Sequence, residues 1–393
     1  MQPSRRSRVV AKGTRNRYAG LMSLLLLATV LGAATPGVAQ QTGGPSLNET
    51  GAPQMPSLGQ NGDFDMPAMT IPFSSFASPE AKRAFIDQIV HPVPMPTGRV
   101  DIPGPAVDKW RQDFDRQQFL PHLQAFEARY PVNIEHKTIG GVNTDIVTPK
   151  DGIGSRNKDR ILINLHGGGF VLGGGIQAQA ESVPIAGAGK IKVITVDYRM
   201  APENKFPAAS EDVAAVYREL LKRYKPENIG IYGCSAGGLL TAQAVAWFQK
   251  EKLPRPGAIG ILCASAGRFG EGDSAYLWPL ATLLPRAGAK SPKIIISYLK
   301  GTDPDDPLVS PVTSPEILAK FPPTLILTST RAVDLSSAVY TDIQLTKAGV
   351  DSELHVWDGL LHGGYLNPDV PESQDAIDFI VKFFDRHLGH HPS

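Results

Sequence analysis

From residue 133 onward, short apolar runs alternate with longer segments whose apolar residues recur at helical spacing. Several short runs are almost continuously apolar, such as Ile161-Leu162-Ile163, as expected of parallel strands that are covered on both faces. This alternation predicts an α/β fold, with a mostly parallel sheet that has helices on both sides. The runs that predict strands lie at 134–138, 145–148, 160–165, 192–197, 228–232, 258–263, 324–328 and 353–357.

Helices are predicted between the strands and ahead of them. Segments 208–223 and 237–250 lie between strands, and Ser78-Pro79 has the capping serine and first-turn proline of a helix start. A second upstream helical stretch covers 106–130, and Pro121 is expected to divide it. The last helix carries an apolar stripe along one face, formed by Ile377, Ile380, Val381, Phe384 and Leu388.

The first 75 residues lack this regular pattern. Six arginines and lysines precede a short apolar run at 21–31, and small residues then end at Ala39. This layout predicts a signal peptide over 1–39, cleavage after Ala39, and export to the periplasm or the medium. The alternative is a single membrane anchor, although the run is short for a bilayer core of about 30 Å. The polar, Gly- and Pro-rich segment 40–75 is expected to be a flexible leader.

Length and charge limit the classes of function. A chain of 393 residues can form one large domain with additions. Its formal net charge of +1 provides no strong field toward nucleic acid or an anionic membrane. Two cysteines, Cys234 and Cys263, are too few for a disulfide framework and are expected to be separate buried thiols, with a pairing left open.

The strongest chemical signal is Gly233-Cys234-Ser235-Ala236-Gly237-Gly238. It directly follows the predicted strand 228–232 and opens a predicted helix, which is the context of a nucleophile elbow. A serine hydroxyl needs to be exposed, aimed and paired with a base before it can act as a nucleophile. Ser235 is therefore the candidate nucleophile, and the alternative is an ordinary glycine-rich turn.

A second glycine-rich segment, His166-Gly167-Gly168-Gly169-Phe170, follows the predicted strand 160–165. Three consecutive glycines can turn backbone N–H groups toward one point and hold a developing oxyanion, together with the N–H of Ala236. A phosphate-binding loop is the alternative, but no Lys-Ser/Thr pair follows. His166 is expected to organise the loop rather than to act as a base.

Activation of a serine requires an imidazole, and His362 is the candidate. Of the nine histidines, it is the one predicted in a loop after the last strand, and it comes late in the chain order of such enzymes. No metal or organic cofactor is required by this chemistry.

The chain resembles the hormone-sensitive-lipase-like family of α/β hydrolases, also called bacterial family IV esterases. The resemblance covers about residues 133–388. It implies an eight-stranded α/β-hydrolase sheet, with a helical cap formed by residues 76–131 and by an insertion at about 266–315 of the catalytic domain 132–390. It also implies an oxyanion hole built from Gly168, Gly169 and Ala236. The matching segments are His166–Phe170, 197–203 with 206–209, Gly233–Gly238 and His362-Gly363.

Two positions depart from the family pattern. Cys234 replaces the usual aspartate before the nucleophile, with little expected consequence. More seriously, an ungapped comparison places Ala332 where the triad acid is expected, and the nearest carboxylate is Asp334. Our hypothesis is that Asp334 orients His362. The alternative is that Asp334 caps the helix that begins near residue 336, with Glu271 and Asp273 as reserve candidates for the acid.

These features predict a serine hydrolase that cleaves small carboxylic esters, with short acyl chains or small alcohols, through an acyl-enzyme on Ser235. An amidase or peptidase of the same fold and a non-catalytic small-ligand-binding relative remain as alternatives. The expected partner is a small-molecule ester, with no nucleic acid and no stable membrane insertion after signal cleavage. The oligomeric state, including a homodimer, is left open.

Overall fold

The computed structural model describes residues 57–58, 60, 64–65, 70–91, 103–282 and 297–389. The chain divides into two compact units, Met1–Ile71 and Pro72–Ser393. In the first unit, β1 (Ser57–Leu58) and β2 (Phe64–Asp65) pair as a short antiparallel hairpin within the predicted leader. The predicted signal segment 1–39 lies outside the described residues, and the signal peptide therefore remains a prediction.

The second unit contains an eight-stranded sheet in the order β10-β9-β8-β7-β5-β6-β4-β3. All of its neighbouring strands are parallel except the pairs β3–β4 and β4–β6. Each of the eight predicted strands is present, which confirms the predicted α/β fold with a mostly parallel sheet. The strands are β3 (Val132–Ile139), β4 (Val142–Pro149), β5 (Ile161–Leu165), β6 (Lys192–Val196), β7 (Ile229–Cys234), β8 (Ala258–Leu262), β9 (Thr324–Arg331) and β10 (Ser352–Leu361).

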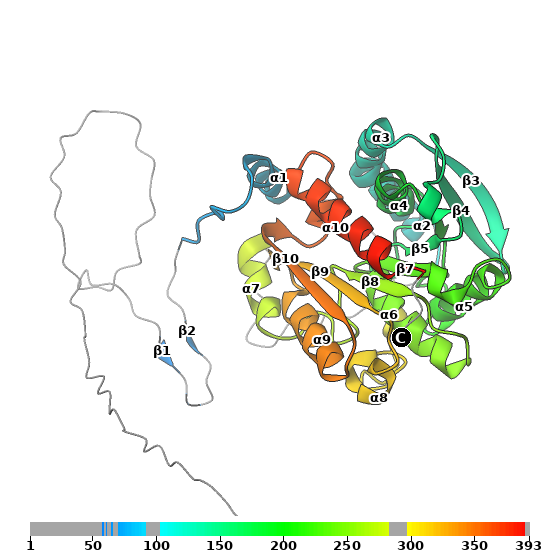
Figure 1. Cartoon of the computed structure of the whole chain (residues 1–393). Helices are drawn as coiled ribbons and strands as arrows, with labels where there is room; N and C mark the ends of the chain where they lie inside the picture. Colours follow the sequence, from blue (N-terminus) through cyan, green and yellow to red (C-terminus); the bar gives the residue numbers. More distant parts are fainter. Residues whose placement is uncertain are drawn as a thin grey trace, which may run out of the picture. The chain divides into compact units, whose positions relative to one another are not determined.

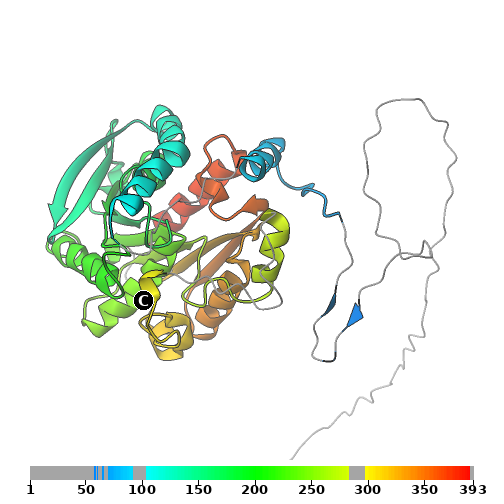
Figure 2. The same cartoon turned by 180° about the vertical axis from the view of Figure 1, so that it is seen from behind.

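Helices cover both faces of the sheet (Figures 1 and 2). Along β5, Ile161 and Ile163 pack into one core with α5 and α6, whereas Leu162 packs into the other core with α4 and α10. This two-sided burial explains why the central strands are apolar without interruption. The helices on the two faces are α3 (Leu120–Arg129), α4 (Ile176–Gly189) and α10 (Pro371–His387) on one, and α5 (Ala208–Leu220), α6 (Ala236–Lys250) and α9 (Leu335–Lys347) on the other.

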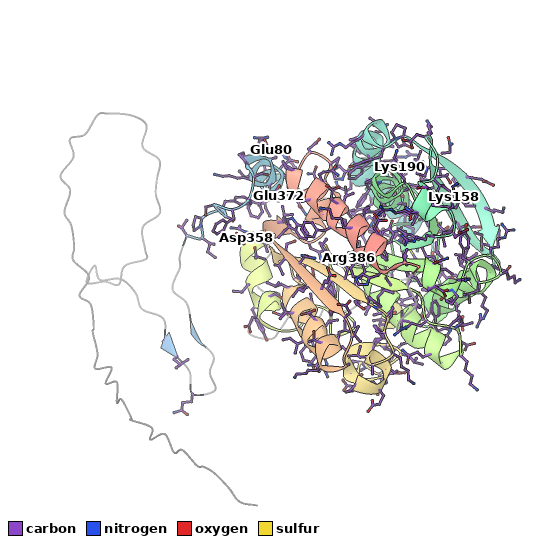
Figure 3. All side chains as sticks on the ribbon, in the orientation of Figure 1. Glu80, Lys158, Lys190, Asp358, Glu372 and Arg386 are labelled. Carbon is purple, nitrogen blue, oxygen red and sulfur yellow. The ribbon has the colours of Figure 1, made fainter. Side chains whose placement is uncertain are left out.

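Helix α1 (Pro79–Val90) lies beside β10 and the start of α10. Its N-cap Ser78 donates from its backbone N–H and its hydroxyl to Glu372, at 2.6 and 2.8 Å. Just upstream, the Ser74 hydroxyl bonds to Asp358, and both carboxylates are labelled in Figure 3. The compact unit therefore begins at Pro72, a few residues before the predicted start of the cap helices.

The predicted helical stretch 106–130 consists of α2 (Pro105–Phe114), a π-helical turn (Asp115–Phe119) and α3. Pro121 stands in the first turn of α3, and the irregular turn directly precedes it, so the predicted division is confirmed. Two further helices, α7 (Asp273–Thr282) and α8 (Pro315–Leu318), lie between β8 and β9. The 3₁₀ turns are Ser155–Asn157, Pro226–Asn228, Ser297–Leu299, Pro311–Thr313 and Gly364–Leu366.

Helix α4 is the long element that has no individual prediction from the sequence. Most of its residues are small or apolar and ten of its fourteen are buried, so it shows no polar face, and Pro184 lies within it. Cys234 and Cys263 are both free and buried, as predicted. Within the described ranges, the model contains no helix that combines the length and the apolar character needed to span a bilayer.

Candidate active site

Ser235 lies at the turn between β7 and α6, with φ 56° and ψ −117°. This left-handed conformation is unfavourable for a residue with a side chain, and it is held because the surrounding backbone is closely packed. A Cβ at Gly237 would lie 1.7 Å from the Leu165 carbonyl oxygen, and one at Gly233 would lie 2.4 Å from that same oxygen. The two glycines are thus required by the close approach of β5 to the turn.

The backbone of Ser235 is also fixed by hydrogen bonds. Its N–H donates to the Leu262 carbonyl at 2.8 Å, and its carbonyl accepts from the Leu239 N–H at 3.1 Å. Because N–H and C=O oppose each other in a trans peptide, this second bond directs the Ala236 N–H away from the helix interior. The structure therefore aims both the hydroxyl and one N–H donor at the end of the sheet.

His362 meets Ser235 at this edge. It directly follows β10, and its Nε2 lies 2.8 Å from the Ser235 Oγ. Its Nδ1 lies 2.5 Å from the Asp334 Oδ1, so the carboxylate holds the proton on Nδ1 and leaves Nε2 free to accept from the serine. The ring of Phe269 stands edge-on to the imidazole, with centroids 5.8 Å apart.

Asp334 is fully buried, at 0% exposure, and its two oxygens contact different partners. Oδ1 faces His362, and Oδ2 accepts from the Thr328 hydroxyl at 2.6 Å. Asp334 does occupy the N-cap position of α9, but its side chain makes no capping hydrogen bond there. Its carboxylate is therefore committed to the histidine and not to the helix, which is the geometry expected of a triad acid.

The other candidates for the acid do not reach His362. Ala332 is buried and contributes no carboxylate. Glu271 is exposed and pairs with Arg268 at 3.2 Å, and Asp273 is exposed at the start of α7. The carboxylate that contacts His362 thus lies two residues later than the ungapped comparison expects.

The electrostatics of the pair follow from this geometry. Burial of the His362 imidazole lowers its pKa, but the charge of Asp334 and the hydrogen bond to it outweigh burial and hold the pKa above the ordinary histidine value. A negative carboxylate at this place stabilises the imidazolium that forms when the imidazole accepts a proton.

The glycine loop presents two further N–H groups. The Gly167 carbonyl lies 2.8 Å from His166 Nδ1, and the Gly168 carbonyl accepts from the Val171 and Leu172 N–H groups at 3.0 and 2.9 Å. In each trans peptide the N–H points opposite to its anchored carbonyl, which directs the N–H groups of Gly168 and Gly169 away from these anchors. In the described part of the chain, neither these two N–H groups nor that of Ala236 has an acceptor.

Residues 197–203 and α2 support the loop from behind. Ala201 donates its N–H to the Phe170 carbonyl at 2.8 Å. Arg111 on α2 donates to the Val171 and Ala201 carbonyls and forms an ion pair with Glu203, all at 2.8 Å. These contacts brace the glycine loop.

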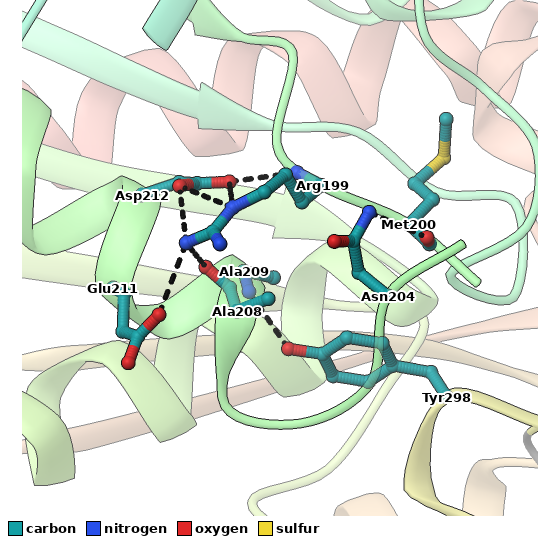
Figure 4. A network of polar contacts seen from close by, with 8 residues as sticks. All are labelled: Arg199, Met200, Asn204, Ala208, Ala209, Glu211, Asp212 and Tyr298. Carbon is teal, nitrogen blue, oxygen red and sulfur yellow. Dashed lines mark hydrogen bonds and ion pairs between the residues drawn. The ribbon is translucent and has the colours of Figure 1, made fainter. Parts of the chain in front are cut away.

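The same stretch is tied to the start of α5 (Figure 4). The Arg199 guanidinium pairs with Asp212 at 2.8 Å and with Glu211 at 3.0 Å. Close by, the Tyr298 hydroxyl accepts from the Ala209 N–H at 2.7 Å, and the Tyr298 ring stacks on Phe170 with centroids 4.6 Å apart. The glycine loop thus packs against a layer of polar and aromatic side chains.

Sequence reasoning gave the positions of Ser235, His362 and Asp334, and the structure brings these three together. It did not identify Thr328, which is an unremarkable threonine near the end of an apolar strand. Its only sequence signal is a polar side chain at the carboxyl end of a buried strand.

In the described ranges, no group of three or more His, Cys, Asp or Glu side chains has a metal-binding arrangement. A cavity of about 450 Å³ lies at the opposite end of α6 from Ser235, beside Phe248 and Leu253.

Comparisons with known proteins point to the same chemistry. The sequence profile of a family described as alpha/beta hydrolase fold matches residues 162–366. An acetyl-hydrolase from Streptomyces hygroscopicus is 30% identical over 254 residues, which cover 64% of this chain and 82% of that protein. A carboxylesterase/phospholipase, LipF, from Mycobacterium tuberculosis is 29% identical over 314 residues, or 76% of each chain.

Solved structures extend the similarity to three dimensions. The crystal structure of an esterase, E25, has a TM-score of 0.69 and 30% identity, and the match covers 83% of this chain and 99% of that one. An esterase from the bacterial hormone-sensitive lipase family has a TM-score of 0.66 and 29% identity, with 79% and 99% coverage. Residues 162–366, which the family profile matches, include the glycine loop, Ser235 and His362.

Proposed function

The chain belongs to the α/β-hydrolase fold family and is a carboxylesterase, and we propose that Ser235, His362 and Asp334 form its catalytic triad. The observation that carries the assignment is the continuous contact from the Ser235 Oγ to His362 and on to Asp334, at 2.8 and 2.5 Å. A hydroxyl, an imidazole and a buried carboxylate in this order can generate an alkoxide-like nucleophile when the imidazole is neutral.

In the first half of the reaction, the Ser235 Oγ attacks the ester carbonyl carbon while His362 Nε2 takes the hydroxyl proton. The carbonyl oxygen becomes an oxyanion, and the N–H groups of Gly168, Gly169 and Ala236 donate to it. The tetrahedral intermediate then collapses, the bond to the alcohol oxygen breaks, and His362 returns its proton to the departing alcohol. Ser235 is left as an acyl ester.

In the second half, water takes the place of the alcohol. His362 accepts a proton from the water as its oxygen attacks the acyl carbon, and the same three N–H groups hold the second oxyanion. The intermediate expels the Ser235 oxygen, which recovers its proton from His362. The products are a carboxylic acid and the free enzyme.

The substrates we propose are esters with short acyl chains or small alcohols. Support comes from relatives named for acetyl esters, including the acetyl-hydrolase and a versiconal hemiacetal acetate esterase that is 26% identical over 264 residues. The segments that we propose as the cap, 76–131 and about 266–315, would limit the length of the acyl chain. In support of this role, Phe269 of the insertion contacts the His362 ring.

The test is hydrolysis of p-nitrophenyl esters with acyl chains from acetyl to palmitoyl, by the parent protein and by Ser235→Ala. We expect activity to be highest at two to four acyl carbons and to fall by about a millionfold in Ser235→Ala. Equal activity of the two proteins would contradict the assignment of the nucleophile. Activity that rises with acyl length would contradict the proposed substrate class.

Two rival activities are separated by further measurements. A matched pair of a short-chain ester and its anilide distinguishes an esterase from an amidase, because an amidase would cleave both at comparable rates. A fluorophosphonate probe distinguishes an enzyme from a non-catalytic ligand-binding relative. We expect a single adduct on Ser235 in the folded protein, and its absence would favour the ligand-binding alternative.

We also propose that the protein is exported after removal of residues 1–39. The support is the sequence pattern of a basic segment, a short apolar run and small residues up to Ala39. Amino-terminal sequencing of the mature protein tests this proposal. A mature chain that begins near Gln40 is expected, and an intact amino terminus in the membrane fraction would favour an anchor.

A further inference from the structure

A buried carboxyl group lies directly behind the glycine loop. Glu181, on α4, is 2% exposed, and its neighbour Gln177, one turn earlier, is 4% exposed. The Glu181 Oε1 accepts from the Gly167 N–H at 2.9 Å and from the Gln177 side-chain amide at 3.0 Å. Among the described residues, no lysine, arginine or histidine forms an ion pair with it. A buried acid without a cation is costly, so its position requires an explanation.

The bond from Gly167 completes a two-sided support of one peptide group. The carbonyl of this peptide belongs to His166 and accepts from the Tyr198 hydroxyl at 2.7 Å. The N–H of the same peptide belongs to Gly167 and donates to Glu181. The peptide that leads into Gly168 and Gly169 is therefore held at both ends by buried side chains, which leaves it little freedom to rotate.

Close packing transmits this support to the loop. A Cβ on Gly167 would lie 2.9 Å from the Gln177 Nε2, 3.1 Å from the Cys234 carbonyl oxygen and 3.3 Å from the Glu181 Oε1. The backbone at Gly167 thus lies directly on the polar groups of α4. Removal of the Glu181 carboxyl would open space behind the loop and leave the Gly167 N–H without an acceptor.

We propose that Glu181 is a positioning residue for the oxyanion hole. Its carboxyl group fixes the His166–Gly167 peptide and thereby the direction of the Gly168 and Gly169 N–H groups. This proposal rests on the proposed function, because it assigns these N–H groups to the oxyanion. Glu181 itself does not touch the substrate.

The chemical state of Glu181 suggests the conservative variant. Burial raises the pKa of its carboxyl to about 7, although the hydrogen bonds from Gly167 and Gln177 lower it. The neutral form, which a glutamine mimics, is therefore present in the folded protein at neutral pH. The titratable groups that face it, from β7 and from the loops after β6 and β10, are Tyr198, Tyr232, Cys234 and Tyr365.

Kinetics of Glu181→Ala and Glu181→Gln on p-nitrophenyl acetate test the proposal. Because the alanine variant loses the alignment of the oxyanion donors, we expect its kcat to fall by about 100-fold while KM changes less than about threefold. Glutamine offers the same acceptor to Gly167, so Glu181→Gln should retain kcat within about threefold. Affinity for an aryl boronic acid, which forms a tetrahedral adduct with the serine, should weaken in parallel with kcat/KM.

Ser182→Ala is the matched control. Ser182 is the next residue of α4, is fully buried, and bonds to the Ala178 carbonyl at 2.8 Å and to Thr195. It does not contact the glycine loop, so its removal should lower the melting temperature without changing kcat. If Glu181→Ala does not fold, Glu181→Asp replaces it, since the shorter acid keeps the carboxyl group but withdraws it from Gly167. Its kcat should then fall at least about tenfold.

Three results would overturn the proposal: a kcat of Glu181→Ala, or of Glu181→Asp in its place, within twofold of the parent, a loss confined to KM, or an equal loss in Glu181→Gln. The parent and Ser235→Ala are measured in the same assay. If the parent hydrolyses the ester and Ser235→Ala does not, the proposed function stands whatever the Glu181 variants do. An inactive parent would instead contradict the proposed function.

Discussion

On the nucleophile side of the site, backbone geometry sets the position of Ser235, whereas on the acid side hydrogen-bonding side chains set the position of Asp334. Ser235 is held by close contacts among main-chain atoms, and a Cβ at Gly237 would lie 1.7 Å from the Leu165 carbonyl oxygen. Asp334 is held by the Thr328 hydroxyl and by His362, at 2.6 and 2.5 Å. The two sides are therefore held by different kinds of interaction.

The difference has a consequence for how the two sides tolerate change. A turn fixed by backbone contacts depends on a short run of small residues, so its sequence is constrained position by position. A carboxylate fixed by two side-chain partners can come from another point in the loop, provided that it reaches them. This explains how the proposed acid can stand two residues after the expected Ala332 while the elbow keeps Gly233, Ser235 and Gly237.

The largest effect that tests this comparison is expected from Asp334→Asn. Without the carboxylate, His362 loses the partner that fixes its tautomer, and kcat should fall by about 10,000-fold. Adding the acid back at the ungapped position, in Ala332→Asp combined with Asp334→Asn, should give no rescue, because Thr328 and His362 both contact the side chain at residue 334. Both the loss and the absence of rescue are measured as kcat on p-nitrophenyl acetate.

A smaller loss of Asp334→Asn, within tenfold of the parent, would show that another group orients the imidazole. Rescue by Ala332→Asp would show that the acid loop is flexible enough to use either position. Either result would contradict the contrast between an elbow that is fixed by backbone contacts and an acid that is fixed by side-chain hydrogen bonds.

On the backbone side, Gly168→Ala and Gly169→Ala form a matched pair. Both glycines have positive φ, 101° and 63°, but a Cβ at Gly168 would lie 2.3 Å from the Leu172 carbonyl oxygen, whereas one at Gly169 meets no atom within 4 Å. Gly168→Ala must displace the loop, so kcat should fall by about 100- to 1,000-fold. Gly169→Ala has only the cost of placing a side chain at positive φ, about 1 kcal/mol, so its kcat should fall less than about tenfold.

Steady-state kinetics and melting temperatures of the two variants distinguish an effect on the oxyanion from general unfolding. Equal losses in the two would mean that φ alone, and not the contact with Leu172, limits the loop. This result would contradict the view that close backbone packing fixes the glycine loop.

The same contrast explains what the sequence could predict. The strands were predictable because their apolar runs are bounded by turns, and the elbow because Gly233, Ser235 and Gly237 carry its geometry locally. Helix α4 was not individually predicted, since burial on all sides removes the polar face that marks a helix. Asp334 was found only as the nearest acid to a mismatch, because its partners come from distant parts of the chain.

Glu181 carried no signal in the sequence, and Thr328 carried only that of a polar side chain at the carboxyl end of a buried strand. Each is a buried polar residue, and its role depends on which backbone or side chain lies opposite it in the folded protein. Contacts of this kind, from a buried side chain to a group of the site, arise from tertiary packing, and a single sequence contains no local pattern for them.

An intermediate effect on the acid side is expected from Thr328→Val, which keeps the shape of the side chain and removes the donor to Asp334. A hydrogen bond to a charged group contributes about 1.5 to 3 kcal/mol, so kcat should fall by about 10- to 100-fold. Thr330→Val is the control on the same strand, because the Thr330 hydroxyl donates to Asp358 and not to the triad. Its kcat should stay within twofold of the parent, and equal losses in both variants would contradict the role of Thr328.

The smallest expected effect is a shift in the titration of the His362 imidazole, which NMR can follow through the ring resonances, assigned with His362→Ala. In the parent, Asp334 holds the pKa above the ordinary value of about 6.5, so the imidazole stays protonated to higher pH and kcat/KM rises as the pH passes through that pKa. In Asp334→Asn the attraction is gone and burial remains, so the midpoint should fall below the ordinary value. Gly169→Ala changes no charge near the ring and should leave the midpoint where it is. A midpoint that does not move in Asp334→Asn would mean that the acid side acts through geometry alone, and the distinction between its electrostatic role and the backbone role of the glycine loop would fail.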